Sequence, residues 1–246
     1  MEKLSADEII DDLEYKELKL IQDNKYFKFG IDAILLIDFA KNIKNDAIVM
    51  DIGTGTGIIP ILLSNKTNLE KIYGVELQEK ISKIAIRNVE LNKLDKKVEI
   101  INDNINNIEK YILRNSLDVI ITNPPYKKKN SGIINAIDEK TIARHEIYCE
   151  FQDICEKSSE LLKNGGELYL IHRPERLVDI IYNLRKYKLE PKILKNIQSY
   201  SDSKPTMVLI KAVKNGNSFL TVEEPLIIYE KNGNYTDKIK EIYGKK

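Results

Sequence analysis

The sequence predicts an α/β fold in which helices cover both faces of a mostly parallel sheet. Short β-branched apolar runs of strand length alternate along the chain with longer segments of helical periodicity. The strand-like runs end in glycine-rich, acidic or Asn-Pro turns, and ligands bind at these strand ends in open sheets of this kind. Because 246 residues can bury one full core, we expect a single domain.

Composition limits the classes of function. The chain is 42% hydrophobic and 31% charged, as in ordinary globular proteins. Its net charge of +1 creates no overall attraction to a polyanion, so any contact with nucleic acid must come from local basic patches. The apolar runs are far shorter than the roughly 18 residues that span a bilayer, and the acidic amino terminus is unlike a signal peptide. We therefore expect a soluble cytoplasmic protein with no membrane contact.

The sequence contains two cysteines, Cys149 and Cys155. Neither has a histidine or a second cysteine at the spacing of a metal site. We interpret them as buried thiols in a reducing compartment, and the sequence predicts no metal site.

The amino-terminal region precedes the first strand of the sheet. Residues 1–15 are expected to form a short acidic helix or tail, and 31–42 a helix. Residues 17–30 alternate polar and apolar side chains, as in a hairpin that turns at Asp23 and Asn24. The stretch 27–32 either covers one end of the sheet or forms a lid over a bound cofactor.

A glycine-rich turn follows the first predicted strand, 47–51. Gly53, Gly55 and Gly57 stand between this strand and an apolar helix, and glycines allow a ligand to approach the backbone closely. The acid Asp51 directly before the turn disfavours a pyrophosphate, so the three-glycine dinucleotide motif fits poorly. A ligand that carries an ammonium group fits Asp51 better.

The second and third predicted strands also end in acids. Glu76 closes the strand 71–76, where a carboxylate can accept hydrogen bonds from both hydroxyls of a ribose. The alternative is an acid that interacts favourably with the dipole of the following helix. Asp103 follows the strand 98–102. It either accepts a hydrogen bond from the amino group of an adenine or caps the predicted helix 105–114.

The fourth predicted strand, the apolar run 119–121, leads into Asn123, Pro124, Pro125 and Tyr126. Two prolines fix the backbone twice and remove two N–H donors, so this turn is rigid and extended. It offers an amide carbonyl and backbone carbonyls beside an aromatic ring, which suits a planar group that carries an NH₂. The alternative is an Asn-Pro turn whose tyrosine is simply packed.

Several basic residues follow this turn. Lys127, Lys128 and Lys129 are either a solvated surface or a contact for phosphate beside the site. His145 is either a hydrogen-bonded turn residue or a contact for the substrate. Arg173 either pairs with a carboxylate or reaches RNA. The other elements that we expect are the helices 78–92 and 148–163, and the strands 167–172, 193–200, 206–213 and 226–229.

These motifs together resemble those of a known family. In chain order, the glycine-rich turn DIGTGTG, the stretch VEL with Glu76, Asp103 and the NPPY turn resemble class I S-adenosylmethionine (SAM)-dependent methyltransferases. Three further stretches narrow the resemblance: FKFGIDAILL at 27–36, ARHE at 143–146 and IHRPERL at 171–177. They are similar to the bacterial family that methylates N6 of adenosine 37, next to the anticodon of tRNA1(Val).

The resemblance implies a seven-stranded Rossmann-like methyltransferase sheet, mostly parallel with one antiparallel strand. It also implies SAM as cofactor and a tRNA anticodon stem-loop as partner, with no obligate protein partner. We expect one methyltransferase domain over 1–246, in which 1–46 form an extension that covers the cofactor and 215–246 form a tail.

The resemblance also implies three groups of site residues. The catalytic residues are Asn123, Pro124, Pro125 and Tyr126. The residues that bind the cofactor are Phe29, Asp32, Asp51, Gly53, Thr54, Gly55, Gly57, Glu76, Leu77, Asp103, Asn104 and Asn123. The residues that bind the substrate are Tyr126, Lys127, Lys128, Lys129, Arg144, His145 and Arg173.

The expected mechanism uses the turn to orient an amino group. Asn123 and the carbonyl of Pro124 accept its two N–H bonds and aim the nitrogen lone pair at the methyl group, while Tyr126 stacks on the base. Other acceptors remain open: a nitrogen of guanine or adenine in ribosomal RNA, N6 of a DNA adenine, or a glutamine amide of a protein. A non-catalytic module that binds SAM is a further alternative.

Overall fold

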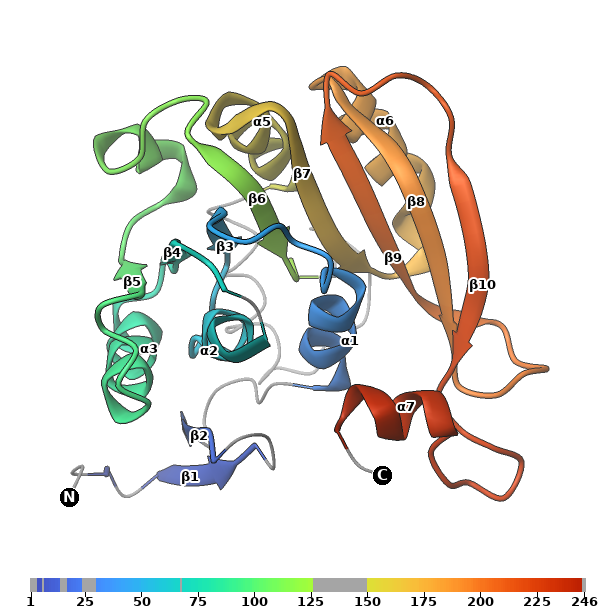
Figure 1. The fold of residues 1–246 in the computed structure, drawn as a ribbon, viewed down its shortest axis with the longest axis horizontal. Helices are drawn as coiled ribbons and strands as arrows, with labels where there is room; N and C mark the ends of the chain where they lie inside the picture. The colour runs from blue at the N-terminus through green and yellow to red at the C-terminus, as the bar shows by residue number, and fades with distance from the viewer. Residues whose placement is uncertain are drawn as a thin grey trace, which may run out of the picture.

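The computed structural model describes residues 4–5, 7–13, 17–23, 30–66, 68–125 and 150–244. This part of the chain forms one large twisted sheet with helices on both faces and a separate two-stranded hairpin (Figure 1). None of its helices is both long enough and apolar enough to cross a membrane.

The large sheet contains eight strands in the order β10-β8-β9-β7-β6-β3-β4-β5. All neighbours are parallel except for β9, which is antiparallel to both β7 and β8. The strands are β3 (Ile48–Ile52), β4 (Lys71–Val75), β5 (Val98–Ile101), β6 (Leu117–Thr122), β7 (Leu162–His172), β8 (Leu189–Gln198), β9 (Pro205–Lys214) and β10 (Thr221–Ile227).

The predicted α/β class and the Rossmann-like arrangement are confirmed. Seven strands have the predicted parallel arrangement with one antiparallel member, and β10 adds an eighth strand parallel to β8 at the edge. Because β9 alone runs backwards, the carboxyl ends of β3, β4, β6, β7 and β8 lie at the same edge of the sheet. This edge is where ligands bind in open α/β sheets.

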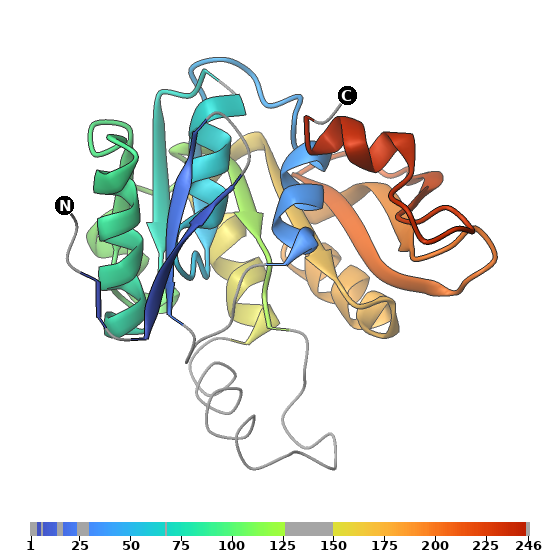
Figure 2. The same cartoon turned by 90° about the horizontal axis from the view of Figure 1, so that it is seen from below.

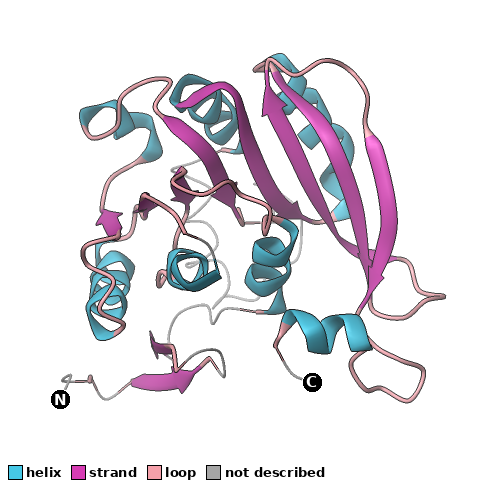
Figure 3. Ribbon diagram, viewed as in Figure 1, coloured by secondary structure: helices cyan, strands magenta, loops and turns pink. Residues whose placement is uncertain are grey.

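Two groups of helices enclose the sheet (Figures 2 and 3). Their apolar faces form two separate cores, one on each side, as expected when strands are buried on both faces. The first side carries α1 (Ile31–Phe39), α2 (Ile58–Lys66), α3 (Glu79–Leu91) and α7 (Asp237–Ile242). The second side carries the 3₁₀ helix η1 (Ile105–Lys110), with α5 (Phe151–Leu161) and α6 (Leu177–Lys186). The short 3₁₀ helix η2 (Pro174–Arg176) directly precedes α6 and has no buried residue.

The amino-terminal segment differs from the prediction. Within 1–15, where we expected a helix or tail, lies β1 (Glu8–Asp12), which pairs with β2 (Lys19–Asp23). Buried Asn88 of α3 fixes this hairpin to the domain: its amide oxygen accepts the Ile21 N–H at 2.6 Å, and its amide nitrogen donates to the Ile21 carbonyl at 3.0 Å. The Asn88 amide thus forms the two hydrogen bonds that a neighbouring strand would otherwise form with the backbone of Ile21.

Two further segments differ from their predicted extent. The helix predicted over 105–114 is confined to the short η1. The segment predicted as a tail, 215–246, carries β10 and α7, whose buried Leu226 and Ile239 belong to the core that also contains residues of α1. The carboxyl-terminal segment therefore covers the sheet and supports α1.

Gly74 in the middle of β4 is required by close packing. A Cβ at this position would lie 2.8 Å from Cδ1 of Ile100 and 2.9 Å from Oγ1 of Thr54. We therefore expect Gly74→Val to lower the free energy of unfolding by about 2 kcal/mol, the usual effect of overpacking a core. Urea unfolding measures this, with Gly30→Ala as control, because a Cβ there meets no atom closer than 4.0 Å. Equal stability of the two variants would contradict the prediction.

Candidate active site

A pocket opens at the carboxyl edge of the sheet, between the ends of β3, β4, β5 and β6. Seven of the predicted site residues line it: Gly53, Glu76, Leu77, Asp103, Asn104, Pro124 and Pro125. The pocket thus joins four turns that lie far apart in the sequence. Its remaining walls are apolar: Ile52, Val75, Ile105 and Ile154.

The glycine-rich turn between β3 and α2 is fixed to the end of β4. The N–H groups of Gly53 and Thr54 both donate to the carbonyl of Val75, at 2.9 and 3.0 Å. Gly53 and Gly55 have φ of +75° and +56°, and a Cβ on either would meet no atom within 4 Å. We expected the turn to approach a ligand closely, and its open side offers the space for this.

Glu76 follows β4 and is buried at the pocket wall. One carboxylate oxygen accepts the N–H of Gly55 at 3.0 Å, and the other accepts the N–H of Gln78 at 2.9 Å. Glu76 therefore connects the glycine-rich turn to the start of α3. Each oxygen keeps a further lone pair, so hydrogen bonds from a ligand remain possible.

Asp51 at the end of β3 is fully buried, and neither of its carboxylate oxygens has a hydrogen-bond partner among the described residues. Burial raises its pKa to about 7. The nearby Thr54 hydroxyl offsets part of this rise, although it does not reach hydrogen-bonding geometry, and the Glu76 carboxylate adds to it. An unpartnered buried acid beside a ligand pocket is a place for a cationic group.

Asp103 accepts local hydrogen bonds from the N–H of Asn104 and the side chains of Asn107 and Tyr111, at 2.7, 2.7 and 3.0 Å. The Asn107 amide, with the other donors, lowers the pKa of Asp103. The prediction that Asp103 caps this helix is wrong, because the cap residue of η1 is Asn104, whose side chain accepts the N–H of Asn106. Asp103 also lines the pocket, so a contact with adenine remains a proposal.

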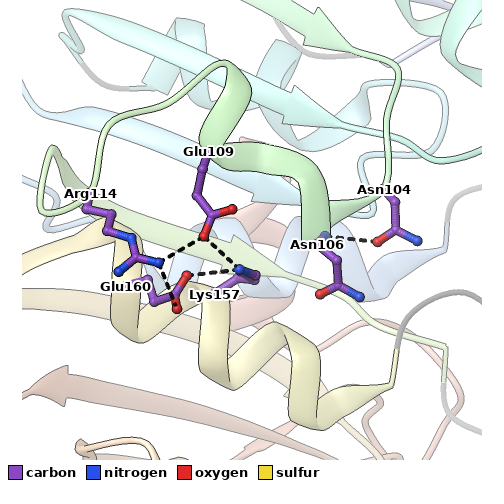
Figure 4. Close-up of polar contacts among 6 residues, drawn as sticks. All are labelled: Asn104, Asn106, Glu109, Arg114, Lys157 and Glu160. Atoms are coloured by element: carbon purple, nitrogen blue, oxygen red, sulfur yellow. Dashed lines mark hydrogen bonds and ion pairs between the residues drawn. The ribbon is translucent and has the colours of Figure 1, made fainter.

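A network of ion pairs holds η1 against α5 (Figure 4). Lys157 of α5 lies 2.9 Å from Glu109 and 3.0 Å from Glu160, and Arg114 contacts the same two carboxylates. The hydrogen bond from Lys157, supported by Arg114, lowers the pKa of Glu109 to about 2. The network fixes two pocket walls relative to each other, because η1 carries Ile105 and α5 carries Ile154.

The Asn-Pro-Pro turn leaves β6 directly beside the glycine-rich turn. The buried Thr122 hydroxyl donates to the carbonyl of Ile52 at 2.9 Å and joins the ends of β6 and β3. Asn123 is half-buried, Pro124 buried and Pro125 exposed. The structure thus brings the two prolines to the same pocket as Glu76.

The other predicted site residues lie in several places. Asp32 is in the first turn of α1, and Arg173 follows β7 and donates to the carbonyl of Thr206 at 3.1 Å. Thr54, Gly55 and Gly57 belong to the glycine-rich turn without lining the pocket, and Asp51 and Asn123 stand next to lining residues without lining it themselves. Predicted residues outside the described part of the chain are Phe29, Tyr126, Lys127, Lys128, Lys129, Arg144 and His145, as is Cys149, whereas Cys155 is buried as expected.

The family profile of the methyltransferase small domain matches residues 30–181, which is more than half of the chain. The chain belongs to the methyltransferase small domain family. The match includes every turn that contributes to the pocket.

Two relatives align with most of this methyltransferase. A tRNA1(Val) (adenine(37)-N6)-methyltransferase of Flavobacterium johnsoniae is 25% identical over 233 residues, which cover 94% of this chain and 98% of the relative. A protein of the same name from Porphyromonas gingivalis is 27% identical over 205 residues, which cover 81% of this chain and 79% of the relative.

Two solved structures share the fold. One is a predicted O-methyltransferase of Agrobacterium tumefaciens, with a TM-score of 0.69 and 20% identity over 87% of this chain and 95% of that chain. The other is TYW2 of M. jannaschii in complex with AdoMet, with a TM-score of 0.58 and 16% identity over 87% and 88%.

SAM is the cofactor of this methyltransferase, and the pocket fits it. The unpartnered Asp51 suits its ammonium group, and Glu76 offers two acceptors for ribose hydroxyls. The apolar walls suit a flat base, as in other nucleotide pockets. Residue by residue, these contacts are proposals.

The apolar walls of the pocket were not predicted. Ile154 lies in the predicted helix 148–163, where its helical spacing is typical of a core residue; it is buried, but it also lines the pocket. Ile105 opens η1, and it looked like any other apolar residue. Periodicity identifies buried positions without showing what they face. A usable signal existed for Ile105 alone, which closely follows the end of β5.

The raised pKa of Asp51 predicts a pH dependence of stability. In the unfolded chain an aspartate titrates near pH ~4, whereas in the fold the pKa of Asp51 is about 7. Between these values the folded protein holds a proton that the unfolded chain has released, so the free energy of unfolding falls as the pH rises and levels off above the folded pKa. Asp51→Asn should remove the contribution of Asp51 to this fall in the free energy of unfolding.

Thermal unfolding without SAM, over a pH series that spans both pKa values, measures the effect. The difference in Tm between the Asn variant and the wild type should grow in favour of the variant as the pH rises. Parallel curves for the two proteins would show that Asp51 does not titrate in this range. The same variant should bind SAM more weakly, because it cannot carry the charge that pairs with an ammonium group.

Proposed function

We propose that this SAM-dependent methyltransferase methylates N6 of an adenosine in tRNA, at adenosine 37 next to the anticodon of tRNA1(Val). The observation that carries the proposal is the rigid Asn-Pro-Pro turn at the rim of the cofactor pocket, with Pro124 and Pro125 in its wall. Two relatives with this activity in their names align over most of the chain, which supports the choice of RNA.

The proposed chemistry is orientation of a weak nucleophile. SAM supplies an electrophilic methyl group when bound. The amide oxygen of Asn123 and the carbonyl of Pro124 accept the two N–H bonds of the adenine amino group, and the nitrogen lone pair then points into the pocket. The hydrogen bond of Thr122 to Ile52 fixes this turn beside the glycine-rich turn, so the acceptors need no rearrangement.

The turn also requires the base to leave its stack. An amino group in a duplex is paired and cannot reach a turn at a sheet edge, whereas an anticodon loop can release a base at small cost. Tyr126 directly follows the turn in the sequence, and its stacking on the base remains a prediction. Lys127, Lys128 and Lys129 remain predicted contacts for phosphates.

The test is to incubate the purified chain with methyl-labelled SAM and separate pools of tRNA, ribosomal RNA, DNA and protein. We expect label in tRNA, as N6-methyladenosine after digestion to nucleosides. A tRNA1(Val) transcript should accept the methyl group, and the same transcript with guanosine at position 37 should not. Label in ribosomal RNA, DNA or protein instead of tRNA would overturn the proposal.

A further inference from the structure

Four tyrosines form a continuous cluster of rings in the carboxyl-terminal part of the chain: Tyr200, Tyr229, Tyr235 and Tyr243. The ring centroids of Tyr229 and Tyr235 are 5.4 Å apart at 12°, and those of Tyr235 and Tyr243 are 5.7 Å apart at 18°, so these three rings are stacked. Tyr200 stands at the other end, 5.7 Å from Tyr229 and tilted by 37°. We call this set the tyrosine cluster.

Backbone hydrogen bonds hold the cluster in place. The N–H of Tyr229 donates to the carbonyl of Ser199 at 2.8 Å, which puts Tyr229 beside Tyr200. Tyr229 and Tyr235 face each other in an isolated antiparallel bridge. Thr236 then caps α7, which brings in Tyr243. The rings are therefore positioned by the fold and do not depend on side-chain packing alone.

The tyrosine cluster lies on the same edge of the sheet as the candidate active site. Tyr200 follows the carboxyl end of β8 and Tyr229 that of β10, and both strands run parallel to β6, which carries the Asn-Pro-Pro turn. In Figure 1 the loop before α7 lies next to the arrowheads of β8 and β10. Three strand spacings, about 14 Å, separate β6 from β8 across the sheet. Through β7 and β9, Thr122 at the end of β6 is level with Leu194, so Gln198 at the end of β8 lies four residues, about 13 Å, further along the strand direction. The tyrosine cluster therefore lies roughly 20 Å or more from the Asn-Pro-Pro turn.

Arg173 occupies the space between the two places. It follows β7, the neighbour of β6, and its guanidinium donates to Thr206 at the start of β9. The edge of the sheet therefore carries, in spatial order, the Asn-Pro-Pro turn, an arginine and an open aromatic ring. A short stretch of single-stranded nucleic acid has this alternation of base and phosphate.

We propose that the tyrosine cluster is a stacking surface for a nucleotide of single-stranded RNA that flanks the methylated base. The inference rests on the proposed function, namely that the substrate is RNA. Tyr200 is the contact residue, because it ends the cluster and is 40% exposed, whereas Tyr235 stands between two other rings. A base that stacks on Tyr200 adds one further ring to the tyrosine cluster.

Stacking, and not charge, is the attraction at this place. The exposed lysines of the two turns, Lys204 and Lys231, are balanced by the exposed acids Asp202 and Glu230. A balanced surface does not hold a polyanion by itself. An aromatic ring accepts any base, since every base has a flat face, so the surface should orient the RNA without reading its sequence.

The decisive variants are Tyr200→Ala, which removes the ring, and Tyr200→Phe, which keeps it. The matched control is Tyr182→Ala, which removes a 68% exposed tyrosine from α6. The probes are bulk tRNA and a fluorescent RNA hairpin with adenosines in its single-stranded loop. Fluorescence anisotropy measures the Kd for the hairpin, methyl transfer to bulk tRNA measures activity, and calorimetry measures the Kd for SAM.

We expect Tyr200→Ala to raise the Kd for the hairpin about ten-fold, the usual effect of losing one aromatic stacking partner. Its Kd for SAM should stay unchanged, and Tyr200→Phe and Tyr182→Ala should bind the hairpin as the wild type does. Unchanged RNA binding by Tyr200→Ala, in a protein that still methylates tRNA, would overturn the inference and leave the proposed function intact. Parallel loss of SAM binding would show a structural role and would also overturn it.

The proposed function fails in a different way. In that case the wild type itself binds neither RNA probe and transfers no label to tRNA, whatever stands at position 200. The wild-type measurements therefore separate the two failures.

Discussion

Replacing Asn123 with alanine is expected to lower kcat for tRNA by roughly 100-fold to 1,000-fold while the Kd for SAM changes little. The magnitude follows from losing one fixed hydrogen-bond acceptor in a site that acts through orientation. The pocket is lined by Pro124, Pro125 and Glu76, and the Asn123 side chain is not among its walls. Cofactor binding should therefore survive the change, whereas the amino group loses one of its two acceptors.

The isosteric variant Asn123→Asp separates an acceptor role from a packing role. A carboxylate at this position still accepts an N–H bond, so this variant should keep more activity than the alanine variant. Single-turnover methyl transfer to bulk tRNA and calorimetric titration with SAM give the two quantities. Full activity of Asn123→Ala would refute the mechanism, and a parallel loss of SAM binding would assign Asn123 to the cofactor instead.

The fold and most of the pocket could be predicted from the sequence for one physical reason. Parallel strands bring their carboxyl ends to one edge, so turns that follow successive strands meet there whatever their distance along the chain. Gly53, Glu76 and Pro124 stand directly after three such strands, and the structure brings all three to one pocket. Their positions just after strand ends were therefore enough to predict that they lie in one pocket.

Long-range contacts could not be predicted in this way. Asn88 joins the hairpin strand β2 to α3 across 67 residues of sequence, but a polar residue within a helix gives no sign of such a partner. The tyrosine cluster could not be predicted either, because Tyr200 follows β8, whereas the other three rings follow β10 or α7, and only the strand order brings these segments together. The strand predicted over 226–229 begins earlier in the structure, at Thr221, because Glu223, Glu224 and Pro225 are atypical of a strand. All three residues fit a strand at the edge of a sheet.

The Glu76→Ala variant is expected to raise the Kd for SAM by about 100-fold or more. A hydrogen bond to a charged acceptor contributes roughly 1.5–3 kcal/mol, and two ribose hydroxyls would lose such an acceptor. The change also leaves the N–H groups of Gly55 and Gln78 without their carboxylate, so the glycine-rich turn loses one of its fixed points. We therefore expect a lower Tm in the absence of SAM as well.

Glu79→Ala is the matched control, because Glu79 is an acid three residues away in the first turn of α3 whose partner is the exposed Lys83. It should leave both the Kd for SAM and the Tm nearly unchanged. Binding to the cofactor and support of the turn are separated by Glu76→Gln, which keeps one acceptor oxygen and should lose less affinity than the alanine variant. If Glu76→Ala lowered the Tm but bound SAM as the wild type does, Glu76 would serve only to fix the glycine-rich turn. The pocket would then have to hold the ribose through Asp103, the other acid in its wall.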